Sequence, residues 1–250
     1  MDSITFCIPH YSKDSKHVEI LMTCIKRIRM FYPKERILIC KTSDSLPFDL
    51  SQYQNIEVFN TYTDGSHVFG AIELLLRKCE TTHYIICHDS MFLLKPLPES
   101  HLQKELYPLW HFNEAAWVFY SGYTSHHVRS FALQQKEIAE LENKHTCDKD
   151  KQLNGIFGPA FGGSIFTLKK IWSILNTGDK IDGGYLRRPG LMVSERVFSV
   201  LFTYLGVKPE ESLNGNIYKH PDVFNTSNVP DFEKIVYPDS YFWKIWQKRN

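Results

Sequence analysis

Thr82-His-Tyr-Ile-Ile-Cys-His-Asp-Ser-Met-Phe-Leu-Leu-Lys-Pro-Leu97 joins an apolar run to a short polar cluster, and the expected fold follows from that combination. Residues 84–87 have the length and composition of a buried strand. His88-Asp89-Ser90, called the 88–90 tripeptide below, interrupts the run before four more apolar residues. Open α/β sheets bind their ligands at the carboxyl ends of central strands. We therefore expect Asp89 to lie at the bottom of a ligand-binding cleft.

Short strands and helices alternate through the N-terminal half. Apolar runs predict strands at Ile4–Ile8, Arg36–Lys41 and Ile56–Phe59. Apolar residues at helical spacing predict helices at Val18–Phe31 and Val68–Cys79. This alternation favours an α/β fold with a Rossmann-like, mostly parallel central sheet flanked by helices.

The C-terminal half has a less regular pattern. It predicts strands at Leu106–Phe112 and Ser164–Leu168, and helices at Ser125–Asn143, Lys169–Leu175 and Leu191–Leu205. The aromatic segment 241–246 is expected to pack on the core, although contact with a ligand or a membrane remains an alternative. Because no linker divides the chain, we expect a single domain over residues 1–250.

Composition excludes several classes of protein. The 29 Lys and Arg residues balance 28 Asp and Glu residues, which argues against nucleic acid as a partner. The six cysteines form no CxxC pair, so we expect no structural zinc site. We expect the cysteines to be reduced thiols. With no signal peptide and no apolar run near the ~20 residues that span a bilayer, we expect a cytoplasmic protein, at most peripherally associated with membranes. No GxGxxG or Walker loop follows the first strand, which disfavours dinucleotide enzymes and P-loop NTPases.

The order helix, strand, 88–90 tripeptide, apolar run and Lys95-Pro96-Leu97 resembles the Asp-x-Asp region of GT-A glycosyltransferases. The resemblance implies a GT-A-like domain in which residues 1–97 bind a nucleotide-sugar and residues 98–250 bind the acceptor. In that family two acids hold a divalent cation, which shields the diphosphate. Here His88 and Ser90 occupy the acid positions, so either Asp89 is the one remaining acid or the register differs by one residue. The implied cofactor is Mn²⁺ or Mg²⁺, with Asp89 as a ligand.

The resemblance also assigns roles in the second half of the chain. Gly162 and Gly163 match a segment whose backbone approaches the donor sugar, or they form a plain turn before a strand. Glu195 matches the acid that deprotonates the acceptor, with Asp182 as the second candidate. The alternative for Glu195 is an interaction with the helix N-terminus or with a neighbouring arginine. His220 matches a further metal ligand or diphosphate contact, or is merely an exposed loop residue.

Two N-terminal loops are implied to hold the nucleotide. The first is Pro9-His10-Tyr11, where Tyr11 can stack on a base. The second contains Thr42 and Asp44, and Asp44 can accept hydrogen bonds from ribose hydroxyls. Gly70, His88, Asp89 and Ser90 complete the expected nucleotide-sugar site.

The expected function is therefore that of a glycosyltransferase. It would move a sugar from a UDP- or GDP-linked donor to a hydroxyl of a glycan, glycolipid or protein acceptor, with inversion at the anomeric carbon. One alternative is a non-catalytic nucleotide-sugar- or glycan-binding protein on the same fold, which the missing second acid supports. Another is a nucleotidyltransferase, although such enzymes usually carry a Gly-rich basic loop that residues 9–11 lack.

Overall fold

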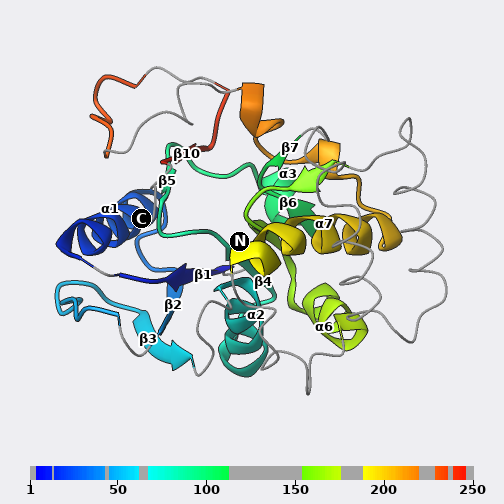
Figure 1. Cartoon of the computed structure of the whole chain (residues 1–250). Helices are drawn as coiled ribbons and strands as arrows, with labels where there is room; N and C mark the ends of the chain where they lie inside the picture. The colour runs from blue at the N-terminus through cyan, green and yellow to red at the C-terminus, as the bar shows by residue number, and fades with distance from the viewer. Residues whose placement is uncertain are drawn as a thin grey trace.

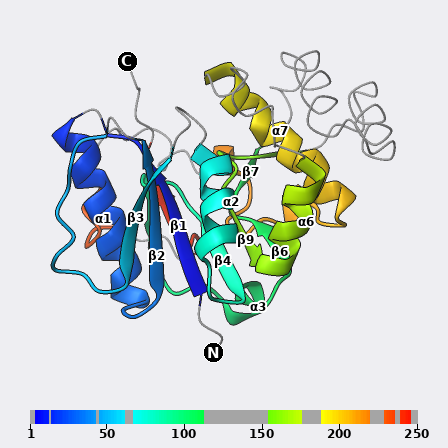
Figure 2. The ribbon, with the colours of Figure 1, turned by 90° about the horizontal axis from the view of Figure 1, so that it is seen from below.

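The computed structural model describes residues 4–12, 14–42, 45–61, 67–112, 154–175, 188–219, 229–235 and 239–245. Within these ranges the main sheet has the strand order β3-β2-β1-β4-β9-β6. The first four strands of that order are parallel, whereas β9 runs antiparallel to both β4 and β6. Figures 1 and 2 show this sheet, whose strands are β1 (Ile4–His10), β2 (Arg36–Thr42), β3 (Ile56–Thr61), β4 (His83–Ile86), β6 (Leu106–Pro108) and β9 (Phe161–Ser164).

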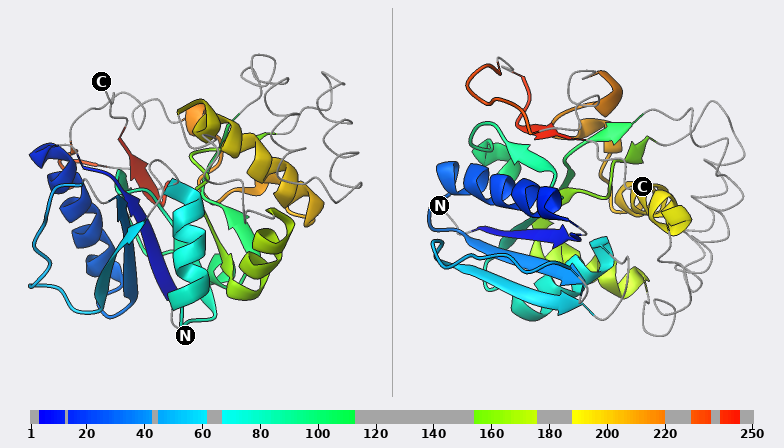
Figure 3. Two further views of the ribbon diagram at one scale, coloured as in Figure 1. Left: turned by 60° about the horizontal axis from the view of Figure 1, so that its bottom comes forward. Right: turned by 60° about the vertical axis from the view of Figure 1, so that its left-hand side comes forward.

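Helices cover both faces of the sheet, and a buried apolar cluster lies on each face. One cluster joins the sheet to α1, and the other joins it to α2, α6 and α7. Figure 3 shows α1 and α2 on opposite sides of the strands. The helices are α1 (Ser15–Phe31), α2 (His67–Lys78), α3 (Glu99–Leu102), α6 (Ile165–Leu175) and α7 (Arg188–Tyr204), with 3-10 turns η3 (Pro209–Glu211) and η4 (Ile217–Lys219). The predicted α/β class with a mostly parallel, helix-flanked sheet is confirmed.

Strand β1 shows why its sequence is apolar throughout. All seven of its residues are buried, since both faces of a parallel sheet are covered by helices. Side chains alternate along a strand, so Phe6 and Ile8 join the cluster on the α1 side while Cys7 joins the cluster on the α2 side.

Helix α1 begins and ends at recognisable signals. The Asp14 side chain caps it by accepting a hydrogen bond of 3.0 Å from the backbone N–H of His17. Leu21, Ile25 and Ile28 form its buried stripe at helical spacing. Asp14 is therefore the N-cap of this helix.

The sheet reverses its direction of growth between β1 and β4. The chain runs from β1 through α1 to β2 and β3, then returns through α2 to β4 on the other side of β1. The β1–β4 register ends at Cys7–Ile86, whereas the β1–β2 register continues to His10–Lys41. The two strands therefore part at their carboxyl ends, and such a switch point is where open α/β sheets bind ligands.

One segment of the C-terminal half contradicts the sequence-based prediction. Ser164–Leu168 is not a strand: Ser164 ends β9, and Ile165–Leu175 is a single helix, α6. The Ser164 Oγ accepts a 3.1 Å hydrogen bond from the backbone N–H of Thr167, as an N-cap does. A short apolar run after a capping serine is as compatible with a first helical turn as with a strand.

The other C-terminal predictions were closer. Residues 106–112 divide into β6 and β7 (His111–Phe112), and β7 pairs with β8 (Gly155–Ile156) in a separate ribbon. Helix α7 begins three residues before its predicted start. The predicted helix at 125–143 lies outside the described residues.

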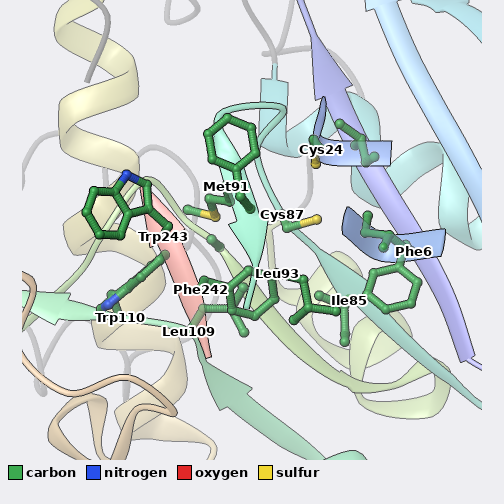
Figure 4. Close-up of a cluster of buried hydrophobic side chains, with 14 of the residues drawn as sticks. Phe6, Cys24, Ile85, Cys87, Met91, Leu93, Leu109, Trp110, Phe242 and Trp243 are labelled. Carbon is green, nitrogen blue, oxygen red and sulfur yellow. The ribbon is translucent and has the colours of Figure 1, made fainter. Parts of the chain in front are cut away.

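The aromatic segment near the C-terminus packs on the core. Strand β10 (Phe242–Lys244) pairs antiparallel with β5 (Met91–Leu93), immediately after the 88–90 tripeptide. Figure 4 shows Phe242 and Trp243 of this segment beside Trp110 and Leu109. Both residues are buried, so core packing is confirmed for them, whereas Trp246 lies outside the described part of the chain.

The described cysteines Cys7, Cys24, Cys40, Cys79 and Cys87 are free thiols. Burial raises the pKa of the Cys7 thiol well above its usual value, which keeps this thiol protonated. In the part of the chain that the structure describes, no helix combines the length and apolar character needed to cross a membrane.

Candidate functional site

His10 and Asp89 meet where β1 and β4 part. His10 is the last residue of β1, and Asp89 follows β4 by three residues. The His10 Nδ1 and Asp89 Oδ2 atoms are 2.8 Å apart, and the two side chains are 0% and 6% exposed. Because a carboxylate only accepts hydrogen bonds, the His10 Nδ1–H donates to Asp89, and Nε2 is the ring nitrogen left for another partner.

Two polar atoms on the β1 side of this edge have no hydrogen-bond partner among the described residues. They are the His10 Nε2 and the Ser12 Oγ, and both are buried. The ring of Phe48 lies edge-on against His10, with 5.4 Å between ring centroids. A buried polar atom without a partner costs about 1–3 kcal/mol. Two such atoms, two residues apart at a switch point, are well placed to receive the polar groups of a ligand.

Gly158 links His88 to Glu195. The His88 Nε2 donates to the Gly158 carbonyl, and the Gly158 N–H donates to the Glu195 Oε1 at 2.8 Å. Gly158 has φ +59°, and a Cβ there would lie 2.5 Å from the His88 Cε1. Glycine is therefore required both by the backbone conformation and by the close approach of the imidazole. Through this one residue, the tripeptide and the predicted base belong to the same network.

Lys244, on β10, contacts the other side of the tripeptide. Its Nζ donates to the Ser90 Oγ and lies 3.5 Å from the His88 Nδ1. The backbone fixes this position, since Ile245 N–H donates to the Ser90 carbonyl at 3.0 Å. Only 6% of Lys244 is exposed. This residue was not predicted from the sequence, although a lone cation in an aromatic segment is the same kind of signal as a lone acid, Glu195, in an apolar helix.

The predicted site residues other than Gly162 and Gly163 divide into three groups. Pro9, His10 and Tyr11 end β1 or follow it, Thr42 ends β2, and the 88–90 tripeptide and Glu195 belong to the network just described. Gly70 lies buried in the first turn of α2. Asp44, Asp182 and His220 lie outside the described residues.

The helix-terminus interpretation of Glu195 is wrong. Helix α7 begins at Arg188, so Glu195 lies about two turns inside it, and its first turn contains no acid. The favourable field of a helix N-terminus falls off within one turn. The Glu195 carboxylate is instead held by the backbone N–H of Gly158.

Gly162 and Gly163 have a clear packing role. They pair with Ile85 and Tyr84 inside the sheet, rather than at the carboxyl edge of the parallel strands. A Cβ on Gly162 would lie 2.5 Å from the Tyr107 ring, and one on Gly163 would lie 2.3 Å from the Glu105 carbonyl oxygen. Their predicted contact with a donor sugar stays a prediction.

The described residues of the tripeptide do not fit a divalent cation. Mn²⁺ and Mg²⁺ need several oxygen ligands. Asp89 is the only carboxylate of the tripeptide, and one of its oxygens binds His10. The His88 Nδ1 and the Ser90 Oγ face the Lys244 ammonium, which would repel a metal ion. Across the described residues, no group of three or more His, Cys, Asp or Glu side chains could hold a metal.

Comparisons with known proteins add little. No family model and no curated protein matches this chain. The crystal structure of S. aureus TarS 1-349 matches 44% of this chain with a TM-score of 0.33 and 8% identity. The match covers 36% of the TarS chain, a little over a third of its length. Similarity at this level supports no functional conclusion.

Proposed function

We propose that this protein is a glycosyltransferase that binds a nucleotide-sugar at the carboxyl edge of β1 and β4. The observation that carries the proposal is the polar network at this switch point, in which His10 and Lys244 contact the tripeptide directly and Glu195 is linked to it through Gly158. Ligands of open α/β sheets bind at such edges. A nucleoside diphosphate offers hydroxyls and a base for the β1 side and negative charge for the Lys244 side.

The nucleoside would lie over the loops that follow β1 and β2. Tyr11 would stack on the base, and Thr42 and Asp44 would contact the ribose. Asp89 would hold His10 in the tautomer whose Nε2 accepts a hydrogen bond. The donor would be a UDP- or GDP-linked sugar, and the acceptor a hydroxyl of a glycan, glycolipid or protein.

Glu195 would act as the base. Its carboxylate would take the proton of the acceptor hydroxyl, whose oxygen then forms a bond to the anomeric carbon. The bond from that carbon to the phosphate oxygen breaks, and its electron pair leaves with the nucleoside diphosphate. Direct displacement of this kind inverts the anomeric carbon. The hydrogen bond from Gly158 supports this role because Gly158 also accepts from His88 and so links the carboxylate to the tripeptide. Asp182 remains the second candidate.

Isothermal titration with UDP, GDP and a panel of their sugars tests the proposal, together with an assay for nucleoside diphosphate release. We expect saturable binding of one nucleotide series and release of its diphosphate when a suitable acceptor is added. Asp89→Asn should weaken binding, whereas the surface variant Glu19→Gln on α1 should match wild type. A chain that binds no nucleotide or nucleotide-sugar would refute the proposal.

A non-catalytic binding protein is the second candidate. The observation that favours it is the replacement of both expected acids by His88 and Ser90. Binding of a nucleotide-sugar without release of its diphosphate, across the acceptor classes named above, would support this alternative over the enzyme.

A further inference from the structure

The geometry points to Lys244 as the resident cation of this site: its ammonium, in place of a divalent metal, faces the diphosphate of the ligand. This inference rests on the proposed function and deepens it. It concerns a residue from the C-terminal segment, far in sequence from the strands that form the rest of the site.

His88 and Ser90 both direct hydrogen-bond acceptors toward Lys244. A carbonyl oxygen can only accept, so the contact with Gly158 places the His88 proton on Nε2. The lone pair of Nδ1 then faces the Lys244 Nζ at 3.5 Å. The Ser90 Oγ likewise accepts from Lys244. The two residues at the expected acid positions therefore both present acceptors to an ammonium.

The pairing of β10 with β5 fixes the position of the Lys244 ammonium. Phe242 and Trp243 are buried, and β10 is fixed by its antiparallel pairing with β5, which starts directly after Ser90 (Figure 4). The Lys244 charge is thereby held near the carboxyl end of β4. Open α/β sheets bind their ligands at this edge. Asp89 and Lys244 also act on one common group. A hydrogen bond with Cys87 and burial raise the pKa of the Cys24 thiol, Asp89 raises it further, and Lys244 lowers it.

The consequence for binding is specific. A lysine ammonium is a compact charge with three donors, well suited to phosphate oxygens. Because this cation belongs to the chain, nucleotide binding needs no added metal. It depends instead on the charge of residue 244.

Titration of UDP and GDP into the full chain, in EDTA and in excess MnCl₂, tests the inference. We expect equal affinity in the two buffers, within about twofold. Lys244→Met should weaken binding roughly 10- to 100-fold, the range for a lost charge-assisted hydrogen bond. Lys244→Arg, which keeps the charge, should stay within about tenfold of wild type. Lys208→Met, which removes an exposed lysine, is the matched control and should bind as wild type.

The titrations distinguish a failure of the Lys244 inference from a failure of the proposed function. Binding that appears only with Mn²⁺, or an unchanged affinity in Lys244→Met, overturns this inference and leaves the proposed function standing. Absence of nucleotide binding in both buffers overturns both. If Lys244→Met does not fold, as a thermal melt would show, the wild-type comparison with and without Mn²⁺ and the Lys244→Arg variant still decide. Mn²⁺ titrated alone, followed by electron paramagnetic resonance, should show no stoichiometric site; a site lost in Asp89→Asn contradicts the inference.

Discussion

Asp89 and Ser90 are neighbours in the chain, but their partners come from opposite ends of it. Asp89 binds His10, 79 residues earlier, whereas Ser90 binds Lys244, 154 residues later. The first partner follows from the parallel pairing of β1 and β4, and the second from the docking of β10 on β5. One side of the tripeptide is therefore part of the nucleotide-binding half that the sequence predicted, and the other is added by the C-terminal segment.

The two sides of the tripeptide carry opposite charges. The β1 side holds a buried carboxylate through an imidazole, and the β10 side supplies an ammonium. Gly158 connects His88, between these two sides, to Glu195. Substitutions at Glu195, His10 and Gly158 test the Gly158 and β1 connections separately, whereas Lys244→Met tests the β10 connection.

Glu195→Gln should lower kcat at least 100-fold with little change in nucleotide affinity. The amide oxygen can still accept from the Gly158 N–H, but an amide cannot take a proton, and general base catalysis contributes about 10²–10⁴-fold. Steady-state kinetics and titration with UDP measure the two quantities. Glu19→Gln is the control, and a Glu195→Gln variant that retains wild-type kcat would exclude Glu195 as the base.

His10→Leu should destabilise the fold by about 3 kcal/mol, because it removes the imidazole partner of a buried carboxylate. The chain supplies a matched control in His17, whose Nδ1 lies 2.7 Å from an Asp14 side chain that is 58% exposed. His17→Leu should cost much less than His10→Leu, since ion pairs with an exposed partner contribute little.

Urea denaturation measures both His→Leu variants, and similar costs would mean that burial does not distinguish the two pairs. The double variant His10→Leu with Asp89→Leu should recover much of the lost stability, because no buried charge remains at this pair. It should not recover nucleotide binding.

Gly158→Ala should cost about 2 kcal/mol of stability and disturb both His88 and Glu195. The variant combines a positive φ with a Cβ that would lie 2.5 Å from the His88 ring. Gly206 has φ +80°, and a Cβ added there would meet nothing within 4 Å, so Gly206→Ala isolates the backbone strain at about 1 kcal/mol. Thermal melts of the two variants should therefore differ, and equal melting temperatures would remove the evidence for tight packing at Gly158.

Glu105→Gln should have the smallest effect, and that effect should depend on pH. Hydrogen bonds from Ser164 and Thr167 lower the pKa of the Glu105 carboxyl. A lowered folded-state pKa stabilises the protein above the unfolded pKa of about 4.3, and this contribution is lost as pH falls through the folded-state value. Wild type should therefore melt slightly above Glu105→Gln at pH 7, with the gap closing in acid; a gap that widens below pH 4 would contradict the cause given for the shift.

The β1 side of the site could be predicted from the sequence because its signals are local. Apolar runs fix β1 and β4, and parallel pairing then brings His10 and Asp89 to one edge. The β10 side could not be predicted, because it depends on which apolar segments pair in the core. Nothing in the local sequence around Phe242 or Met91 indicates that these two segments pair with each other. The same limit applied to Ser164: its side chain caps a helix, but an apolar run after a serine fits a strand equally well.

A crystal structure of the full chain with UDP, grown in EDTA, would locate the diphosphate relative to Lys244. We expect the diphosphate within hydrogen-bond distance of the Lys244 Nζ and the uracil over the loop at Tyr11, with Asp89 still paired to His10. UDP bound away from the carboxyl edge of β1 and β4, or bound there only through a metal ion held by Asp89 when Mn²⁺ replaces EDTA, would contradict this expectation.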